Sequence, residues 1–102
     1  MPAHPPLLEA DVRRALSRMP GWSGSTAGLT RSWRFASFPA ALAFMQACVA
    51  GIEAINHHPE WTNVYDHVSV RLCTHDAGDA VTEADLVLAR LLDEHARAHH
   101  GR

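Results

Sequence analysis

The sequence predicts an α+β fold, a two-layer sandwich in which three helices cover one face of a four-stranded antiparallel sheet in the order α-β-β-α-β-β-α. Helical periodicity occurs in three separate stretches, and extended stretches arrive in pairs joined by short connections, which favours antiparallel pairing. A length of 102 residues leaves room for one hydrophobic core. We therefore expect residues 1–102 to form a single domain.

The first helix and the first hairpin follow from local patterns. Leu8, Val12, Ala15 and Leu16 form an apolar stripe at helical spacing, and Met19-Pro20-Gly21 ends it. The next stretch, Trp22 to Phe35, has glycines at the turn between two short extended segments. Its second arm places Leu29, Arg31, Trp33 and Phe35 on one face, so a hairpin with one buried face is expected.

A long second helix is the most regular element of the sequence. Ser37 can cap it and Pro39 suits its first turn. Apolar residues keep the 3.6-residue period from Phe38 to Ile55, and the helix must end before Pro59, which restricts the residue preceding it.

Two strands and a third helix complete the chain. The even positions from Val64 to Thr74 are apolar except for Asp66 and Thr74, and this alternation predicts a half-buried strand. A short strand around Trp61 to Tyr65 is expected before it. Thr82 and Asp85 form a capping pattern that opens a last helix running through His95. Exposed strand edges and leftover apolar helix faces in so short a chain favour self-association, as a homodimer or homotetramer.

Composition excludes two classes of partner. The hydrophobic share of 47% and the charged share of 20% are ordinary for a soluble domain. Nine basic against eleven acidic residues lack the positive charge that nucleic-acid binding requires. The longest uncharged stretch, Phe35 to Ile52, is interrupted by Ser, Pro, Gln and Gly, so we expect no membrane-spanning helix.

The amino-terminal residues and the cysteines indicate a reducing compartment. Met1 to Pro6 lack the basic start and apolar run of a signal peptide, so we expect a cytoplasmic protein. Cys48 and Cys73 are then expected to be reduced and buried.

The densest polar cluster lies between the second helix and the next strand. It contains Glu53, His57, His58 and Trp61, and imidazoles exchange protons near neutrality because their ordinary pKa is about 6.5. Glu53 lies one turn before His57, near enough to accept a hydrogen bond from an imidazole, and Trp61 offers a flat wall for a heteroaromatic ligand. The alternative is structural: the two histidines favour the negative end of a helix dipole, and Trp61 belongs to the core.

A third imidazole can join this cluster from a distant part of the chain. His75 follows the last strand, and a sheet edge can bring it beside His57 and His58. Three histidines could bind zinc, but further ligands at suitable spacing are lacking, so we expect no metal. Asp85 could reach the same pocket or act only in the helix cap, and His95, His99 and His100 are expected on a fraying tail.

The spacing of these residues resembles a known family. The run Glu53-x-x-x-His57-His58-Pro59-Glu60-Trp61-x-Asn63-Val64-Tyr65, followed by Thr74-His75-Asp76 and then Asp85, resembles the signature of the pterin-4a-carbinolamine dehydratases. Similar residues, among them Gly21-Trp22 and Gly28-Leu29-x-Arg31, extend the resemblance from Leu8 to Asp93. One departure is a longer loop from Gly78 to Val81, with Asp79 where a second glycine is common.

The resemblance implies a hydro-lyase that eliminates water from a 4a-hydroxytetrahydropterin and gives the quinonoid dihydropterin, in recycling of tetrahydrobiopterin, without cofactor or metal. It implies that His57 and His58 transfer protons and that His75 completes the triad and contacts the pterin. Glu53 would orient the His57-His58 turn, Trp61 would wall the pocket, and Asp85 would belong to the substrate site. An aromatic amino acid hydroxylase would supply the substrate.

The resemblance also implies an alternative of another class. Members of this fold are known as dimerisation cofactors of transcription factors and, in diverged forms, as assembly chaperones, which act through a helical surface rather than the pocket. The complete set of histidines in this chain favours catalysis.

Overall fold

A computed structural model describes residues 4–102 of the chain. Met1, Pro2 and Ala3 belong to the segment that was compared with a signal peptide, and they lie outside the described residues. The elements are α1 (Glu9–Leu16), β1 (Ser23–Ser25), β2 (Gly28–Arg34), α2 (Phe38–Ile55), β3 (Glu60–Val64), β4 (His67–Leu72), a short 3-10 helix η1 (His75–Ala77) and α3 (Glu83–Ala98). The predicted order of helices and strands is confirmed, with η1 as an addition.

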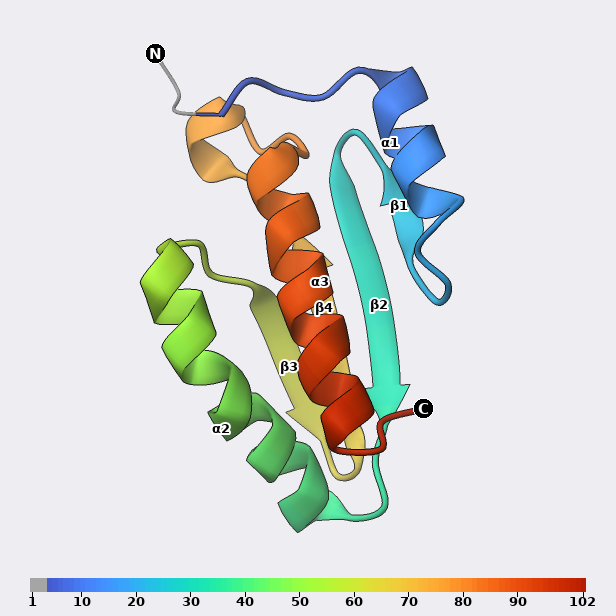
Figure 1. The fold of residues 1–102 in the computed structure, drawn as a ribbon, viewed down its shortest axis with the longest axis vertical. Helices are drawn as coiled ribbons and strands as arrows, with labels where there is room; N and C mark the ends of the chain where they lie inside the picture. The colour runs from blue at the N-terminus through green and yellow to red at the C-terminus, as the bar shows by residue number, and fades with distance from the viewer. Residues whose placement is uncertain (1–3) are drawn as a thin grey trace.

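The four strands form one antiparallel sheet in the order β1-β2-β4-β3. The second hairpin therefore joins the first through β4, and β3 forms the edge opposite β1. The helices lie on one side of this sheet, with α2 and α3 across its face and α1 beside β1 (Figure 1). The predicted α+β sandwich is confirmed.

The core lies between the sheet and the two long helices. Alternation in β2 buries Leu29 and Trp33, and alternation in β4 buries Val68, Val70 and Leu72. From the helices, Phe44 stacks on Phe35 with ring centroids 4.8 Å apart. The opposite face of the sheet carries exposed polar residues such as Thr30, Ser32 and Arg71, as the alternating pattern predicts.

The predicted strand from Val64 to Thr74 is wrong at its start. The chain reverses at Tyr65 and Asp66, so Val64 is the last residue of β3 and is 72% exposed. Tyr65 has a φ of 53°, and the side-chain amide of Asn63 donates to the carbonyls of Tyr65 and His67. Val64 and Val68 keep the even spacing on the two sides of this tight turn, so the pattern alone does not reveal the reversal.

Helix α2 begins and ends at the expected residues. The Ser37 hydroxyl accepts a hydrogen bond from the Ala40 amide at 3.2 Å, and Asn56, in the left-handed conformation, ends the helix. Ala41, Phe44, Cys48 and Ile52 are buried, and burial raises the pKa of the Cys48 thiol to about 12.

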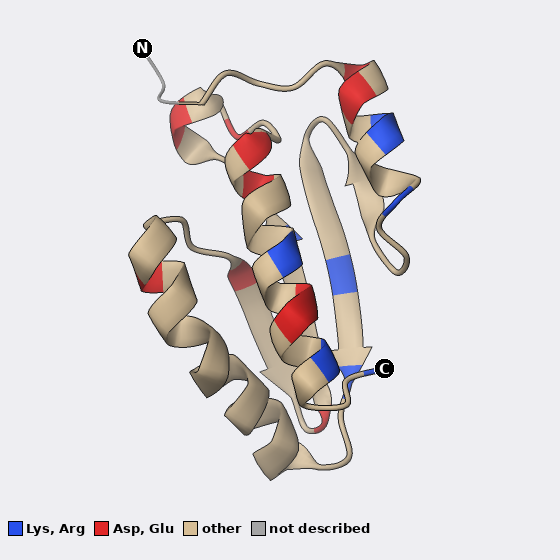
Figure 2. Cartoon of the chain, viewed as in Figure 1, with Lys and Arg blue, Asp and Glu red and all other residues tan. Residues whose placement is uncertain are grey.

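The other side of α2 is apolar and exposed. Phe38, Leu42, Val49 and Ile55 are each between about a third and a half exposed, and Glu53 is the single charged residue of the helix (Figure 2). The length and composition of α2 would suit a membrane-spanning helix, but the core helix of a soluble protein meets the same two criteria. The polar interruptions in the sequence therefore do not exclude a spanning helix by themselves.

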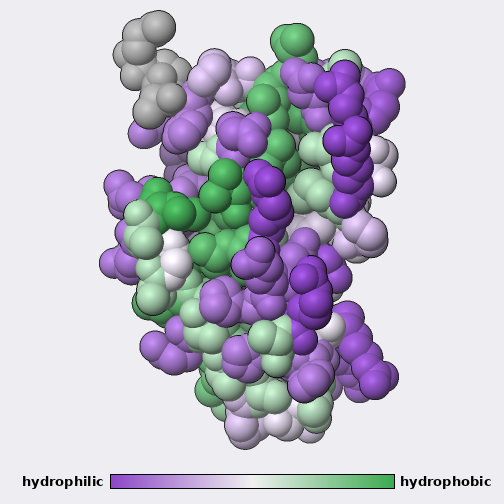
Figure 3. Space-filling model, in the orientation of Figure 1, coloured by the Kyte–Doolittle hydropathy of each residue, from purple (hydrophilic) through white to green (hydrophobic). Residues whose placement is uncertain are grey.

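Polar side chains cover much of the outer side of α3, and apolar side chains reach the surface between α3 and α2 (Figure 3). The C-terminal residues do not fray as expected. Arg102 exchanges two backbone hydrogen bonds with Arg34, at 2.8 and 2.9 Å, which holds the chain end against β2.

Candidate active site

An open cavity of about 310 Å³ lies where α2 gives way to β3 and where β4 ends. Its volume falls at the lower end of the roughly 300–1,000 Å³ typical of small-molecule sites. Among the described residues, the cavity is lined by Asn56, His57, His58, Pro59, Glu60, Cys73, Thr74, His75 and Asp76. The three histidines that the sequence singled out therefore share one cavity.

The backbone brings these distant residues together in a simple way. The left-handed conformation of Asn56 turns the chain out of α2, so His57 and His58 follow immediately in the connection to β3. β3 pairs antiparallel with β4, and Glu60 stands opposite Arg71. The start of β3 thus adjoins the end of β4, where His75 opens η1.

His57 is held by the buried carboxylate of Asp85. Its Nε2 lies 2.6 Å from Asp85 Oδ1, and the aspartate is fully buried. Because a carboxylate only accepts, neutral His57 donates through Nε2–H and keeps its lone pair on Nδ1. A proton taken up at Nδ1 would give an imidazolium whose positive charge Asp85 stabilises.

Asp85 serves the helix cap and the site at once. Its Oδ2 accepts hydrogen bonds from the Thr82 amide and the Thr74 hydroxyl, each at 2.9 Å. Thr82 and Asp85 form the predicted capping box. One carboxylate oxygen caps α3 and the other contacts His57, so the capping interpretation of Asp85 is confirmed. Asp85 is not among the residues that line the cavity and is linked to it through His57.

His58 has a different partner and a different environment. Its Nε2 lies 2.6 Å from Glu53 Oε2, and both side chains are more than half exposed. Glu53 thus contacts the second histidine, not His57 one turn after it. The left-handed turn at Asn56 accounts for this, since helical spacing no longer applies beyond the end of α2.

His75 pairs with Asp79 from the loop that follows η1. Its Nδ1 contacts Asp79 Oδ1, and the hydrogen bond raises the pKa of the exposed His75 imidazole. Asp79 has a φ of 60°, a conformation in which aspartate is tolerated better than most residues. The residue at which the loop departs from the family pattern is therefore the partner of His75.

Trp61 lies outside this cavity. It packs against the core and lines a groove with Pro39, Leu42 and Val49 of α2. On β3 it occupies the position after Glu60, so it points to the face of the sheet that the helices cover. In the isolated chain its side chain belongs to the α2 groove.

Sequence reasoning missed three contributors to the site. Thr74 donates to Asp85, Asp79 contacts His75, and Cys73 lines the cavity while remaining only 6% exposed. Alternation predicted that Thr74 faces inward, which could have signalled its contact with the helix cap. The contact between Asp79 and His75 depends on a loop conformation that alternation does not encode.

The fold and the cavity define a small α+β domain with a histidine-lined site suited to acid-base chemistry. Residues 5–95 match the family described as pterin 4 alpha carbinolamine dehydratase. The chain belongs to this family, as the resemblance in the sequence implied.

Relatives and a solved structure agree with this assignment. The chain is 47% identical to a protein of Opitutus terrae over 88 residues, 86% of this chain and 91% of that protein. It is 43% identical to one of Burkholderia multivorans over 98 residues, 94% of this chain and 93% of the other. Both are named "Putative pterin-4-alpha-carbinolamine dehydratase". A crystal structure from Brucella melitensis, named transcriptional coactivator/pterin dehydratase, has a TM-score of 0.82 and 37% identity, covering 88% of this chain and 97% of that one.

Proposed function

We propose that this protein is a 4a-hydroxytetrahydrobiopterin dehydratase. The substrate loses the proton on N5 and the hydroxyl on C4a, the C4a–O bond breaks, and a C4a=N5 double bond forms. The products are water and quinonoid dihydropterin. The observation that carries this proposal is that three imidazoles line one cavity large enough for a small bicyclic ligand.

The contacts of the three imidazoles suggest which one accepts a proton and which one donates a proton in the elimination. His57 suits the proton acceptor, because Asp85 would stabilise the imidazolium that forms. His75 suits the donor to the departing hydroxyl, because Asp79 raises its pKa and keeps it protonated at higher pH. His58, held by Glu53, completes the proton-transfer set. The elimination needs neither cofactor nor metal, and Asp85 acts on the substrate through His57.

The test is the rate of dehydration of 4a-hydroxytetrahydropterin generated by a hydroxylase. The wild-type protein should exceed the spontaneous rate, and His57→Ala or His58→Ala should lower the enzymatic rate by about 10²–10⁴. His95→Ala is a matched control, because that histidine lies on α3 outside the cavity lining. A wild-type rate equal to the spontaneous one would overturn the proposal.

A second candidate function is an interaction module, favoured by the exposed apolar side of α2. We propose that this side joins copies of the chain into a homodimer or homotetramer. The coactivator part of the Brucella melitensis protein's name suggests a further protein-binding role of this kind.

We place the enzyme in the cytoplasm, where an aromatic amino acid hydroxylase would supply its substrate and where the tetrahydrobiopterin is recycled.

A further inference from the structure

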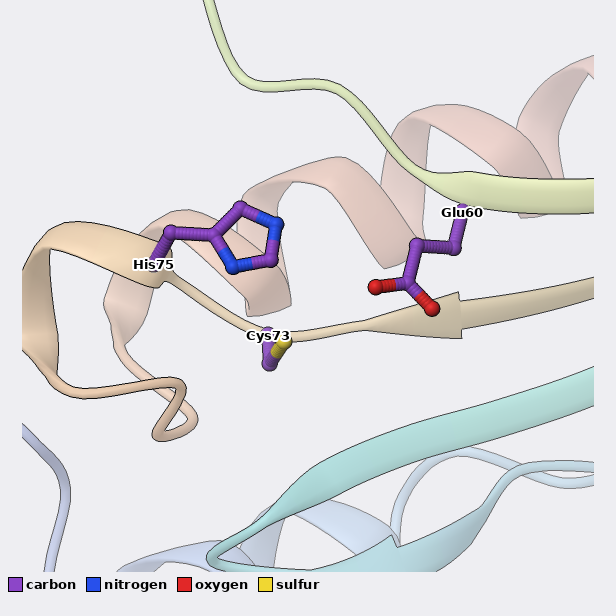
Figure 4. A group of neighbouring side chains, drawn as sticks. All are labelled: Glu60, Cys73 and His75. Carbon is purple, nitrogen blue, oxygen red and sulfur yellow. The ribbon is translucent and has the colours of Figure 1, made fainter.

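Three different metal-ligand types meet at one end of the cavity. A carboxylate oxygen of Glu60, the sulfur of Cys73 and a ring nitrogen of His75 all lie within 4.8 Å of one another. Glu60 and the imidazole of His75 face each other across a gap beside Cys73 (Figure 4). The three residues come from the start of β3, the end of β4 and η1, so the sheet register fixes their approach.

Carboxylate, thiolate and imidazole together are a typical ligand set for zinc. Zinc binds sulfur at about 2.3 Å and nitrogen or oxygen at about 2.0–2.2 Å, so the ligands of one ion lie closer together than the 4.8 Å that bounds this group. The Glu60 and His75 side chains are 57% and 72% exposed, so surrounding atoms leave them room to move toward an ion. The buried Cys73 is the fixed member of the group. The open cavity leaves a fourth position for water.

The Asp79 carboxylate contacts the His75 imidazole on the side away from the proposed ligand nitrogen. Asp79 engages Nδ1 of His75, which leaves Nε2 as the nitrogen that can hold the lone pair for an ion. Metal-bound histidines commonly have a carboxylate in this position, which fixes the ring and makes it a better ligand.

The charges around the group are compatible with a divalent cation. The Glu60 carboxylate and a Cys73 thiolate neutralise two positive charges. Arg71 lies close, with Nη1 at 3.4 Å from the Cys73 sulfur and 4.0 Å from Glu60 Oε2. Burial raises the pKa of Cys73, and the Arg71 charge acts in the opposite direction. A bound ion would replace the thiol proton of Cys73 and the contacts of Arg71 with Cys73 and Glu60.

We propose that Glu60, Cys73 and His75 form an inhibitory site for zinc or a similar thiophilic divalent cation. The ion occupies one end of the cavity and takes up the lone pair of His75, so ion and pterin exclude each other. Binding of the ion stands on the ligand geometry alone. Its inhibitory effect rests on the proposed dehydratase function.

The test is titration of the tag-free, full-length, reduced protein with Co²⁺ and with Zn²⁺. The wild type should bind Co²⁺ with the charge-transfer absorption of a cobalt-thiolate bond, and Zn²⁺ should displace it. Cys73→Ala should abolish the band, and Asp79→Asn should weaken binding about 10–100-fold. Cys48→Ala is the matched control, because Cys48 is a second buried cysteine outside the cavity lining, and it should keep the band.

The sulfur signal separates this site from the C-terminal histidines, because any ion bound there would lack a thiolate ligand. Glu60→Gln, with a folded circular dichroism spectrum, gives an independent check by weakening Co²⁺ binding. Absence of the thiolate band in the wild type, or its survival in Cys73→Ala, would overturn the site. Binding without any dehydratase activity would refute only the proposed function, and an active enzyme that Zn²⁺ binds but does not inhibit would refute the inhibition.

Discussion

At the residue scale, two histidine-carboxylate pairs that look equivalent in the sequence differ in their surroundings. His57 pairs with the fully buried Asp85, and His58 pairs with the exposed Glu53, both at 2.6 Å. A buried carboxylate that loses its partners keeps the cost of its removal from water, whereas water replaces a lost partner at the surface. The two pairs should therefore respond differently to the same substitution.

Asp85→Asn should lower the dehydration rate by on the order of 10²-fold, because the neutral amide no longer stabilises the imidazolium that forms at His57. It should also destabilise the fold by about 1–3 kcal/mol, because the Thr74 and Thr82 contacts are weakened. The matched variant Glu53→Gln should cost less than about 1 kcal/mol. Denaturant unfolding together with the turnover assay measures both, and equal stability losses in the two variants would contradict this account.

His75 should titrate above the ordinary value of 6.5, because the Asp79 hydrogen bond favours its protonated form. The pair then adds stability in full below the unfolded-state pKa and loses it as the pH rises through the higher folded-state pKa. NMR titration of the imidazole should show the shift, and Asp79→Asn should lower the midpoint. A midpoint that Asp79→Asn leaves unchanged would exclude the pairing in solution.

At the element scale, the first hairpin depends on a glycine that touches backbone. Gly24 has a φ of 139°, and a Cβ there would lie 2.1 Å from the Gly28 carbonyl oxygen. Gly78 also has a positive φ, 76°, but a Cβ there would meet open space. These two positions separate conformational strain from a steric clash.

Gly24→Ala should destabilise the protein by more than about 2 kcal/mol, since the hairpin must move to remove the clash. Gly78→Ala should cost only about 1 kcal/mol, the strain of a positive φ alone. Thermal unfolding of both variants provides the measurement, and a Gly24→Ala midpoint equal to that of Gly78→Ala would refute the steric argument.

At the scale of the whole molecule, the exposed apolar side of α2 is the surface that we propose to be buried between copies of the chain. The oligomeric mass is therefore the quantity to measure. Leu42 and Val49, seven residues apart, are 43% and 41% exposed on that side. Seven residues make two helical turns, so the two side chains lie on one stripe.

The double substitution Leu42→Glu with Val49→Glu should reduce a dimer or tetramer to the monomer, because charges on this stripe would be buried at the interface. Light scattering after size-exclusion chromatography measures the mass. The control Thr30→Glu places a charge on the polar face of the sheet and should leave the mass unchanged. A monomeric wild type, or a double variant of unchanged mass, would contradict the proposed assembly.

Much of the fold was predictable because it depends on local patterns. Helical periodicity placed α2, the capping residues Thr82 and Asp85 placed the start of α3, and alternation identified the buried face of β2. The sequence likewise singled out His57, His58 and His75, three of the residues that line the cavity.

Tertiary structure alone decided which side chains meet. It assigned Asp85 to His57, Glu53 to His58 and Asp79 to His75, and it placed Trp61 in the α2 groove rather than in the cavity. It also decided the reversal at Tyr65. The physical reason is that sequence periodicity reports which face of an element is buried, whereas contacts between elements depend on turns and strand register.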